Sequence, residues 1–257
     1  MMKLKWVKKD FNDDIEFILF HQQDNTPNWW RRALFNAYPD LDMEYAKSLN
    51  QQARNKYLTQ EMQKISVNNA KEFQHAIDVF QQEWNNKADK LNSAFSSAFD
   101  NDCADILNNM QAEVGLNPIC PRDVHNYTFS VYYRMLPKWA IATALHEMTH
   151  FVWFYFWQKH FHDNPNDYDN PHLKWLLSEI VVETIIRNSE IGTISENPKH
   201  IAYSYFYDME INGCPIFDVM REMYLDRKNI FDFMKQSFKW ISDNKQELRN
   251  KISIAEQ

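Results

Sequence analysis

Apolar residues recur every three or four positions along residues 51–98, a stretch that is otherwise polar and lacks glycine and proline. Phe73, Phe80 and Trp84 follow this spacing, which places apolar side chains on one face of an α-helix. The pattern predicts one or two long amphipathic helices here, preceded by short helices over residues 27–50.

The second half of the chain changes between strand and helix patterns. Apolar residues alternate at Val114 and Leu116, and residues 127–135 (YTFSVYYRM) are rich in β-branched and aromatic types, so both segments are expected to be strands. Pro137 marks the start of a strongly apolar helix that ends near the polar sequence FHDNPND. A second apolar helix is expected over residues 171–187, and helices broken at NGCP follow it.

These elements predict a mainly helical α+β fold. The chain has only 3 glycines, which disfavours a large antiparallel β fold with many tight hairpins. We expect an N-terminal helical region over residues 1–103 and a metal-binding region over residues 104–257, packed as one compact unit.

Charge and composition exclude several classes of function. The net charge is −7 and no stripe of lysine or arginine is present, so a nucleic-acid partner is not expected. The scattered residues Cys103, Cys120 and Cys214 indicate reduced thiols in a cytoplasmic protein. Residues 139–157 are long enough to span a bilayer, but ionisable groups near the middle of the segment favour a buried helix over a membrane span. The oligomeric state is not indicated.

The apolar helix contains His146-Glu147-Met148-Thr149-His150, an HExxH motif. Positions i and i+4 share one face of a helix, so both imidazoles can bind one zinc ion. Glu147 lies beside them and can act as a general base. Burying two histidines and a glutamate without partners would cost several kcal/mol, and a metal ion removes that cost.

Catalytic zinc usually takes a third protein ligand. Glu179 and Glu183 are the only charged residues in WLLSEIVVETII and lie one helical turn apart. We assign Glu179 as the third ligand and Glu183 as a carboxylate that accepts the second N–H of a metal-bound histidine. The reverse assignment of the two glutamates stays open. The rival ligands are His160, His162 and His172.

The motif HEMTH followed by Glu179, 29 positions after His150, resembles the gluzincin metallopeptidases, the group that contains thermolysin and the zinc aminopeptidases. The resemblance covers about residues 126–187 and implies a zincin-like fold, in which two core helices carry the metal and a small antiparallel sheet lies beside them. It also implies that the strand before the motif helix forms an edge for an extended substrate. Glu183 occupies the position of an aspartate in that family. The residue pattern of this region is also similar to that of uncharacterised bacterial HExxH proteins.

The sequence therefore predicts a Zn²⁺-dependent hydrolase, a peptidase, acting on a peptide or small amide substrate, with Glu147 as its base. Tyr203 and His200 are candidate donors to the developing oxyanion. One alternative is a zinc-stabilised helical interaction protein without catalysis. Another is a metal-free buried polar network.

Overall fold

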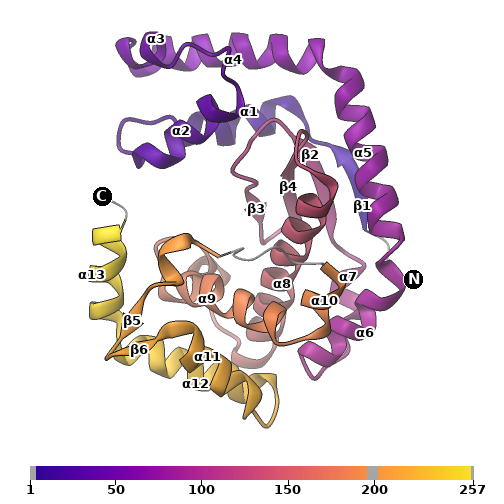
Figure 1. Cartoon of the computed structure of the whole chain (residues 1–257), viewed down its shortest axis with the longest axis vertical. Helices are drawn as coiled ribbons and strands as arrows, with labels where there is room; N and C mark the ends of the chain where they lie inside the picture. The colour runs from indigo at the N-terminus through magenta and orange to yellow at the C-terminus, as the bar shows by residue number, and fades with distance from the viewer. Residues whose placement is uncertain (1–3, 196–201, 256–257) are drawn as a thin grey trace. The chain divides into compact units, whose positions relative to one another are not determined.

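The computed structural model describes residues 4–195 and 202–255 (Figure 1). The described residues form thirteen α-helices, two short 3₁₀ helices, a four-stranded sheet and a two-stranded sheet. The prediction of a mainly helical α+β fold is confirmed.

The chain divides into two units that interleave along the sequence. Unit 1 comprises the described residues of Met1–Leu4, Trp84–Met110 and Ile141–Gln257, and unit 2 comprises Lys5–Glu83 and Gln111–Ala140. The boundary expected after residue 103 stays a prediction.

Unit 2 contains the four-stranded sheet, in the order β1-β2-β4-β3. The strands are β1 (Lys5–Lys8), β2 (Gln111–Gly115), β3 (Arg122–Asp123) and β4 (Thr128–Tyr132). The expected antiparallel sheet was wrong in part, because β1 pairs with β2 and β2 with β4 in parallel, and only β3 runs antiparallel to β4.

Chain connectivity explains this mixed sheet. Residues 116–127 return the chain to the starting end of the sheet, so β4 runs in the direction of β2, and β3 adds on the outer side of β4 during that return. Arg122 and Asp123 thus cover Phe129 and Thr128, and β4 is not the outermost strand that the family resemblance implied.

The polar stretch 51–98 forms three helices, where one or two were expected. Asn69 ends the first of them, since its side-chain amide donates to the carbonyl of Ile65 at 2.9 Å and competes with the helical pattern. The helices that begin in this half of the chain are α1 (Phe11–Phe20), α2 (Asn28–Ala37), α3 (Met43–Ser48), α4 (Gln51–Asn68), α5 (Ala70–Asn85) and α6 (Ala88–Ala98).

A buried carboxylate connects α1 to the end of β2 within unit 2. Asp14 accepts a hydrogen bond from the backbone N–H of Leu116, whose carbonyl accepts one from the Tyr38 hydroxyl at 2.7 Å. A Cβ atom at Gly115 would lie 2.7 Å from the Asp14 carboxylate, so any larger residue there would have to displace that side chain. Burial raises the pKa of Asp14 to about 6, although the Leu116 hydrogen bond opposes the shift.

Unit 1 is built around two apolar helices, α8 and α9, which carry the candidate site. Helix α9 packs against α10, α11, α12 and the 3₁₀ helix η1. The remaining helices of the chain are α7 (Ala104–Leu107), α8 (Pro137–Phe161), η1 (Pro165–Tyr168), α9 (Leu173–Arg187), α10 (Glu190–Ser195), η2 (Ser204–Phe206), α11 (Ile216–Leu225), α12 (Ile230–Asp243) and α13 (Lys245–Ala255).

The sequence NGCP, expected only to break a helix, turns a two-stranded hairpin. Strand β5 (Glu210–Ile211) pairs antiparallel with β6 (Cys214–Pro215). Asn212 and Gly213 join them with φ angles of 52° and 75°, which is the backbone that a type I′ turn requires at both central positions.

None of the described helices is long and apolar enough to cross a membrane.

Candidate metal centre

Helix α8 holds both motif histidines near its middle. Between Ala140 and Trp157, every residue except Thr143 and Tyr155 is buried. The motif therefore lies in a helix that is enclosed on almost all sides, and neither His146 nor His150 can rely on bulk water for its hydrogen bonds.

Helix α9 contributes the carboxylate of Glu179 to the candidate site. All its residues from Leu176 to Ile186 are buried, including Glu179 and Glu183. The apolar composition of this segment explains its burial, and the two glutamates are placed in the interior by their spacing of one turn.

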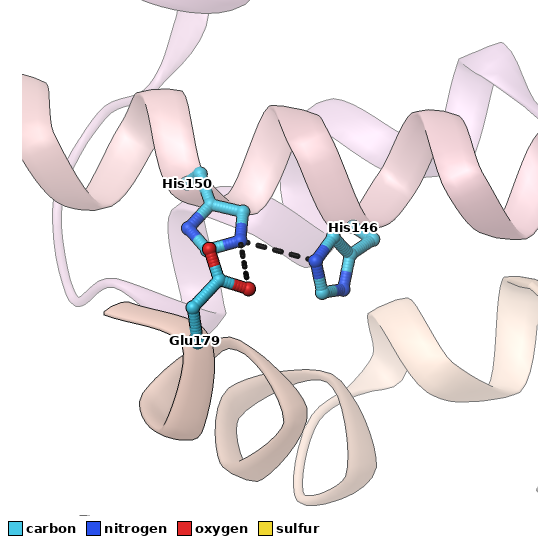
Figure 2. A group of neighbouring side chains, drawn as sticks. All are labelled: His146, His150 and Glu179. Atoms are coloured by element: carbon cyan, nitrogen blue, oxygen red, sulfur yellow. Dashed lines mark hydrogen bonds and ion pairs between the residues drawn. The ribbon is translucent and has the colours of Figure 1, made fainter. Parts of the chain in front are cut away.

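Figure 2 shows the rings of His146 and His150 projecting from one helix toward the Glu179 carboxylate, which extends from a second helix. The two Nε2 atoms are 3.0 Å apart, and Glu179 Oε2 lies 3.7 Å from His150 Nε2. All three ligand atoms lie within 4.8 Å of one another. Among the described residues, these three form the group that can hold a metal ion.

The two printed separations between ligand atoms are compatible with a tetrahedral metal ion such as zinc. A tetrahedral zinc with bonds of about 2.0–2.1 Å separates two of its ligand atoms by roughly 3.3 Å. The observed separations of 3.0 and 3.7 Å lie on either side of that value. Two imidazole nitrogens and one carboxylate oxygen are also a donor set that zinc prefers.

Without a cation, the two rings can share one hydrogen bond between their Nε2 atoms. At most one proton can lie between the two Nε2 atoms, and 3.7 Å is too long for a hydrogen bond from His150 to Glu179. One divalent ion would accept the lone pairs of both Nε2 atoms and of a Glu179 carboxylate oxygen together.

Asp163, in the loop after α8, fixes the ends of the two helices that carry the site. Its carboxylate accepts from Trp157 Nε1 at 2.8 Å, from the Tyr168 hydroxyl at 3.0 Å and from Lys174 Nζ at 2.6 Å. Burial lowers the pKa of Lys174, but the hydrogen bonds to Asp163 and Asp167 outweigh it and raise the pKa overall. The sequence reasoning missed this role, although the acidic residues before Lys174 were a visible signal.

Aromatic stacking orients the second histidine. The His150 ring lies nearly parallel to the Phe154 ring at 6.4 Å, and Phe154 stacks on Tyr168 at 4.3 Å. The Tyr168 hydroxyl donates a hydrogen bond to Asp163, so this row of three rings connects His150 to the loop after α8.

Glu183 has a partner on its own helix. The guanidinium of Arg187, one turn later, donates to the Glu183 carboxylate and lies over the ring of Tyr207 at 5.5 Å. Burial raises the pKa of Tyr207, and the negative charge of Glu183 raises it further. The sequence reasoning missed Arg187, although the i, i+4 spacing from Glu183 is typical of a helix ion pair. The assignment of Glu183 to a metal-bound histidine stays a prediction.

The remaining candidate residues lie in different settings. Glu147 is 7% exposed and follows His146 directly on α8. The Tyr203 ring lies 6.4 Å from that of Trp175, which precedes Glu179 by one turn on α9. His200 lies outside the described residues.

The three rival histidines lie elsewhere. His160 stacks on Phe231 with the ring centroids 4.1 Å apart, His162 is exposed, and His172 is half exposed with Asp167 at 3.8 Å. Glu179, rather than any of these, completes the group with His146 and His150.

No known protein family, curated protein or solved structure matches this chain. The site is therefore defined by its own geometry: a buried His, His and Glu group, consistent with an HExxH…E site.

Proposed function

We propose that the chain is a zinc-dependent hydrolase that cleaves peptide or amide bonds. The observation that carries this proposal is the buried group of His146, His150 and Glu179, whose ligand atoms lie within 4.8 Å of one another. Three protein ligands leave one position of a tetrahedral zinc ion for water or substrate, as a catalytic site requires. Structural zinc sites usually have four protein ligands, so the donor count favours catalysis.

The chain supplies the groups that such a reaction needs. A bound zinc ion lowers the pKa of water and polarises a carbonyl. Glu147 accepts the proton of the attacking water and returns it to the leaving amine. Tyr203 is a candidate hydrogen-bond donor to the negative charge that develops on the substrate oxygen, because its ring lies 6.4 Å from that of Trp175, one turn before Glu179 on α9. His200 is a second candidate.

A second function is favoured by burial. His146, His150 and Glu179 are 8%, 0% and 4% exposed, and a closed site of this kind suits a zinc ion that stabilises a helical interaction protein. In that case zinc raises the melting temperature and no substrate is cleaved.

The test compares the zinc-loaded wild type with Glu147→Gln on a mixed peptide library, read out by mass spectrometry. We expect cleavage by the wild type and a loss of about a hundredfold or more in Glu147→Gln, because general-base catalysis contributes 10² to 10⁴ in rate. Glu222→Gln, on the exposed face of α11, is the matched control and should retain activity.

Zinc content and melting temperature are measured on each variant. Equal zinc content in Glu147→Gln and wild type, with activity lost only in the former, supports the hydrolase. Zinc-dependent stabilisation of both proteins, with no cleavage above the Glu147→Gln background, supports the interaction protein.

A further inference from the structure

Unit 2 contains a cavity of about 270 Å³ between the loop after α1 and helices α2, α3 and α4. We call it the α2–α4 cavity. Its size is near the lower end of the range for small-molecule sites. All the residues that line it belong to unit 2, so the cavity is separate from the metal centre.

The lining of the α2–α4 cavity is cationic. Arg31, Arg32, Lys47 and Arg54 contribute four positive charges, and Asp24 contributes the one negative charge. The whole chain carries a net charge of −7, so this local excess of positive charge opposes the average. A concave surface with one sign of charge concentrates ligands of the opposite sign.

Arg54 lines the cavity and connects the segments that surround it. Its buried guanidinium donates to the carbonyls of Ala46, Gln22 and Leu49 at 3.2, 2.9 and 3.1 Å, and to Asp24 at 2.7 Å. Arg54 thus holds the segments around the cavity in place and neutralises Asp24, the acidic residue in its lining.

The other three cations are available to a ligand. Arg31 donates to the neutral Asn28 side chain at 2.7 Å, and Arg32 is exposed. Lys47 pairs with Glu44 at 2.8 Å, but their side chains are 52% and 78% exposed, and ion pairs in that setting contribute little. A guanidinium can bind a carboxylate or phosphate through two parallel hydrogen bonds.

Phe35 and Met43 add an apolar part to the lining. Phe35 lies one turn after Arg31 on α2, so the apolar and cationic groups lie along the same side of that helix. We propose that the α2–α4 cavity binds a small organic anion, a carboxylate or phosphate ester attached to an apolar group. This proposal does not depend on the metal centre.

The test is calorimetric titration of the full chain with phenyl phosphate and, separately, benzoate at low ionic strength. Benzamide is the uncharged control. We expect at least one of the two anions to bind and benzamide to bind at least about tenfold more weakly, because charged hydrogen bonds supply most of the affinity. The anion that binds more tightly identifies the source of the charge, a phosphate ester or a carboxylate.

The variants locate the bound anion. Arg31→Gln/Arg32→Gln should weaken binding by about tenfold or more, and Lys47→Gln by about threefold. Lys56→Gln is the matched control, since Lys56 is exposed on α4 and lies outside the lining, and it should bind within about twofold of the wild type. Arg32→Gln alone, at an exposed position, tests the proposal if the double variant does not fold.

Three results would overturn the proposal. The first is that neither anion binds at concentrations up to about 10 mM. The second is that benzamide binds as well as the anions. The third is that Lys56→Gln loses as much affinity as the arginine variants, which indicates non-specific attraction.

Discussion

Two successive turns of α9 place a buried glutamate in opposite settings. Glu183 meets the guanidinium of Arg187 on its own helix. Glu179, one turn earlier, has its Oε2 atom 3.7 Å from Nε2 of His150. That Nε2 atom is in turn 3.0 Å from Nε2 of His146. Both glutamates lie in the stretch of α9 from Leu176 to Ile186, in which every residue is buried.

The two glutamates differ in the side chains that lie beside them. Arg187 carries a permanent positive charge and donates to the Glu183 carboxylate on the same helix. Imidazoles become cationic only by protonation, and both rings at the Glu179 turn direct Nε2 to one point. We therefore expect the turn that carries Glu183 to act mainly in stability and the turn that carries Glu179 to take part in the proposed metal site.

The largest expected effect is on zinc affinity. Glu179→Gln should weaken zinc binding by about a thousandfold, on the order of 4 kcal/mol, because it removes one of three ligands. Glu183→Gln, the matched change one turn later, should alter the affinity by no more than about fivefold. Competition titration against a chelator measures both values.

A loss of 10- to 100-fold in Glu183→Gln would instead support its assignment as the carboxylate that bonds a metal-bound histidine. Equal losses in the two variants would contradict the contrast between the two turns.

The next largest effect is on the free energy of unfolding, and it concerns the ion pair of Glu183 and Arg187. Arg187→Met should lower the free energy of unfolding by about 3 kcal/mol, because it leaves the buried Glu183 carboxylate without its cation. Glu183→Gln/Arg187→Met should recover most of that loss, since no unpaired charge remains. Urea denaturation measures both variants, and equal stability of the single and double variants would show that the pair is not coupled.

The smallest expected effect is on the pH dependence of stability. It concerns a third buried carboxylate, Asp14, in unit 2. Its pKa is raised from 3.8 to about 6 in the folded chain. Between these values the unfolded chain releases the proton and the folded chain keeps it, so Asp14 destabilises the fold increasingly as the pH rises. The stability of Asp14→Asn relative to the wild type should therefore increase by about 2 kcal/mol from pH 4.5 to pH 7.

Urea midpoints of the two proteins at both pH values measure this difference, and other titrating groups cancel between them. A stability difference that does not change with pH, or that falls, would show that Asp14 is ionised in the folded chain above its ordinary pKa.

The parts of the site that depend on local spacing could be predicted from the sequence. His146 and His150 share a helix face by their spacing alone, and the apolar residues around Glu179 predicted its burial. The bounds of α8 followed from Pro137 and from the polar loop after Phe161. Short-range periodicity determines these features, so one sequence was sufficient.

Features that depend on distant pairing could not be predicted in the same way. Strand β1 is four residues long and pairs with β2, more than a hundred residues later, so no local pattern identifies its partner. The parallel direction of β2 and β4 depends on the path of the chain between them. The contacts of Asp163 with Trp157 and Lys174 likewise require the loop geometry. The hairpin at Asn212 and Gly213 is different, because the Asn-Gly signal was present in the sequence.

Anomalous diffraction at the zinc edge, from crystals of the zinc-loaded chain, tests whether His146, His150 and Glu179 bind the ion. A zinc ion bound at this site gives one strong peak about 2.0–2.2 Å from His146 Nε2, His150 Nε2 and a Glu179 carboxylate oxygen. Fully occupied zinc at other residues, with no peak between these three side chains, would contradict the proposed metal site.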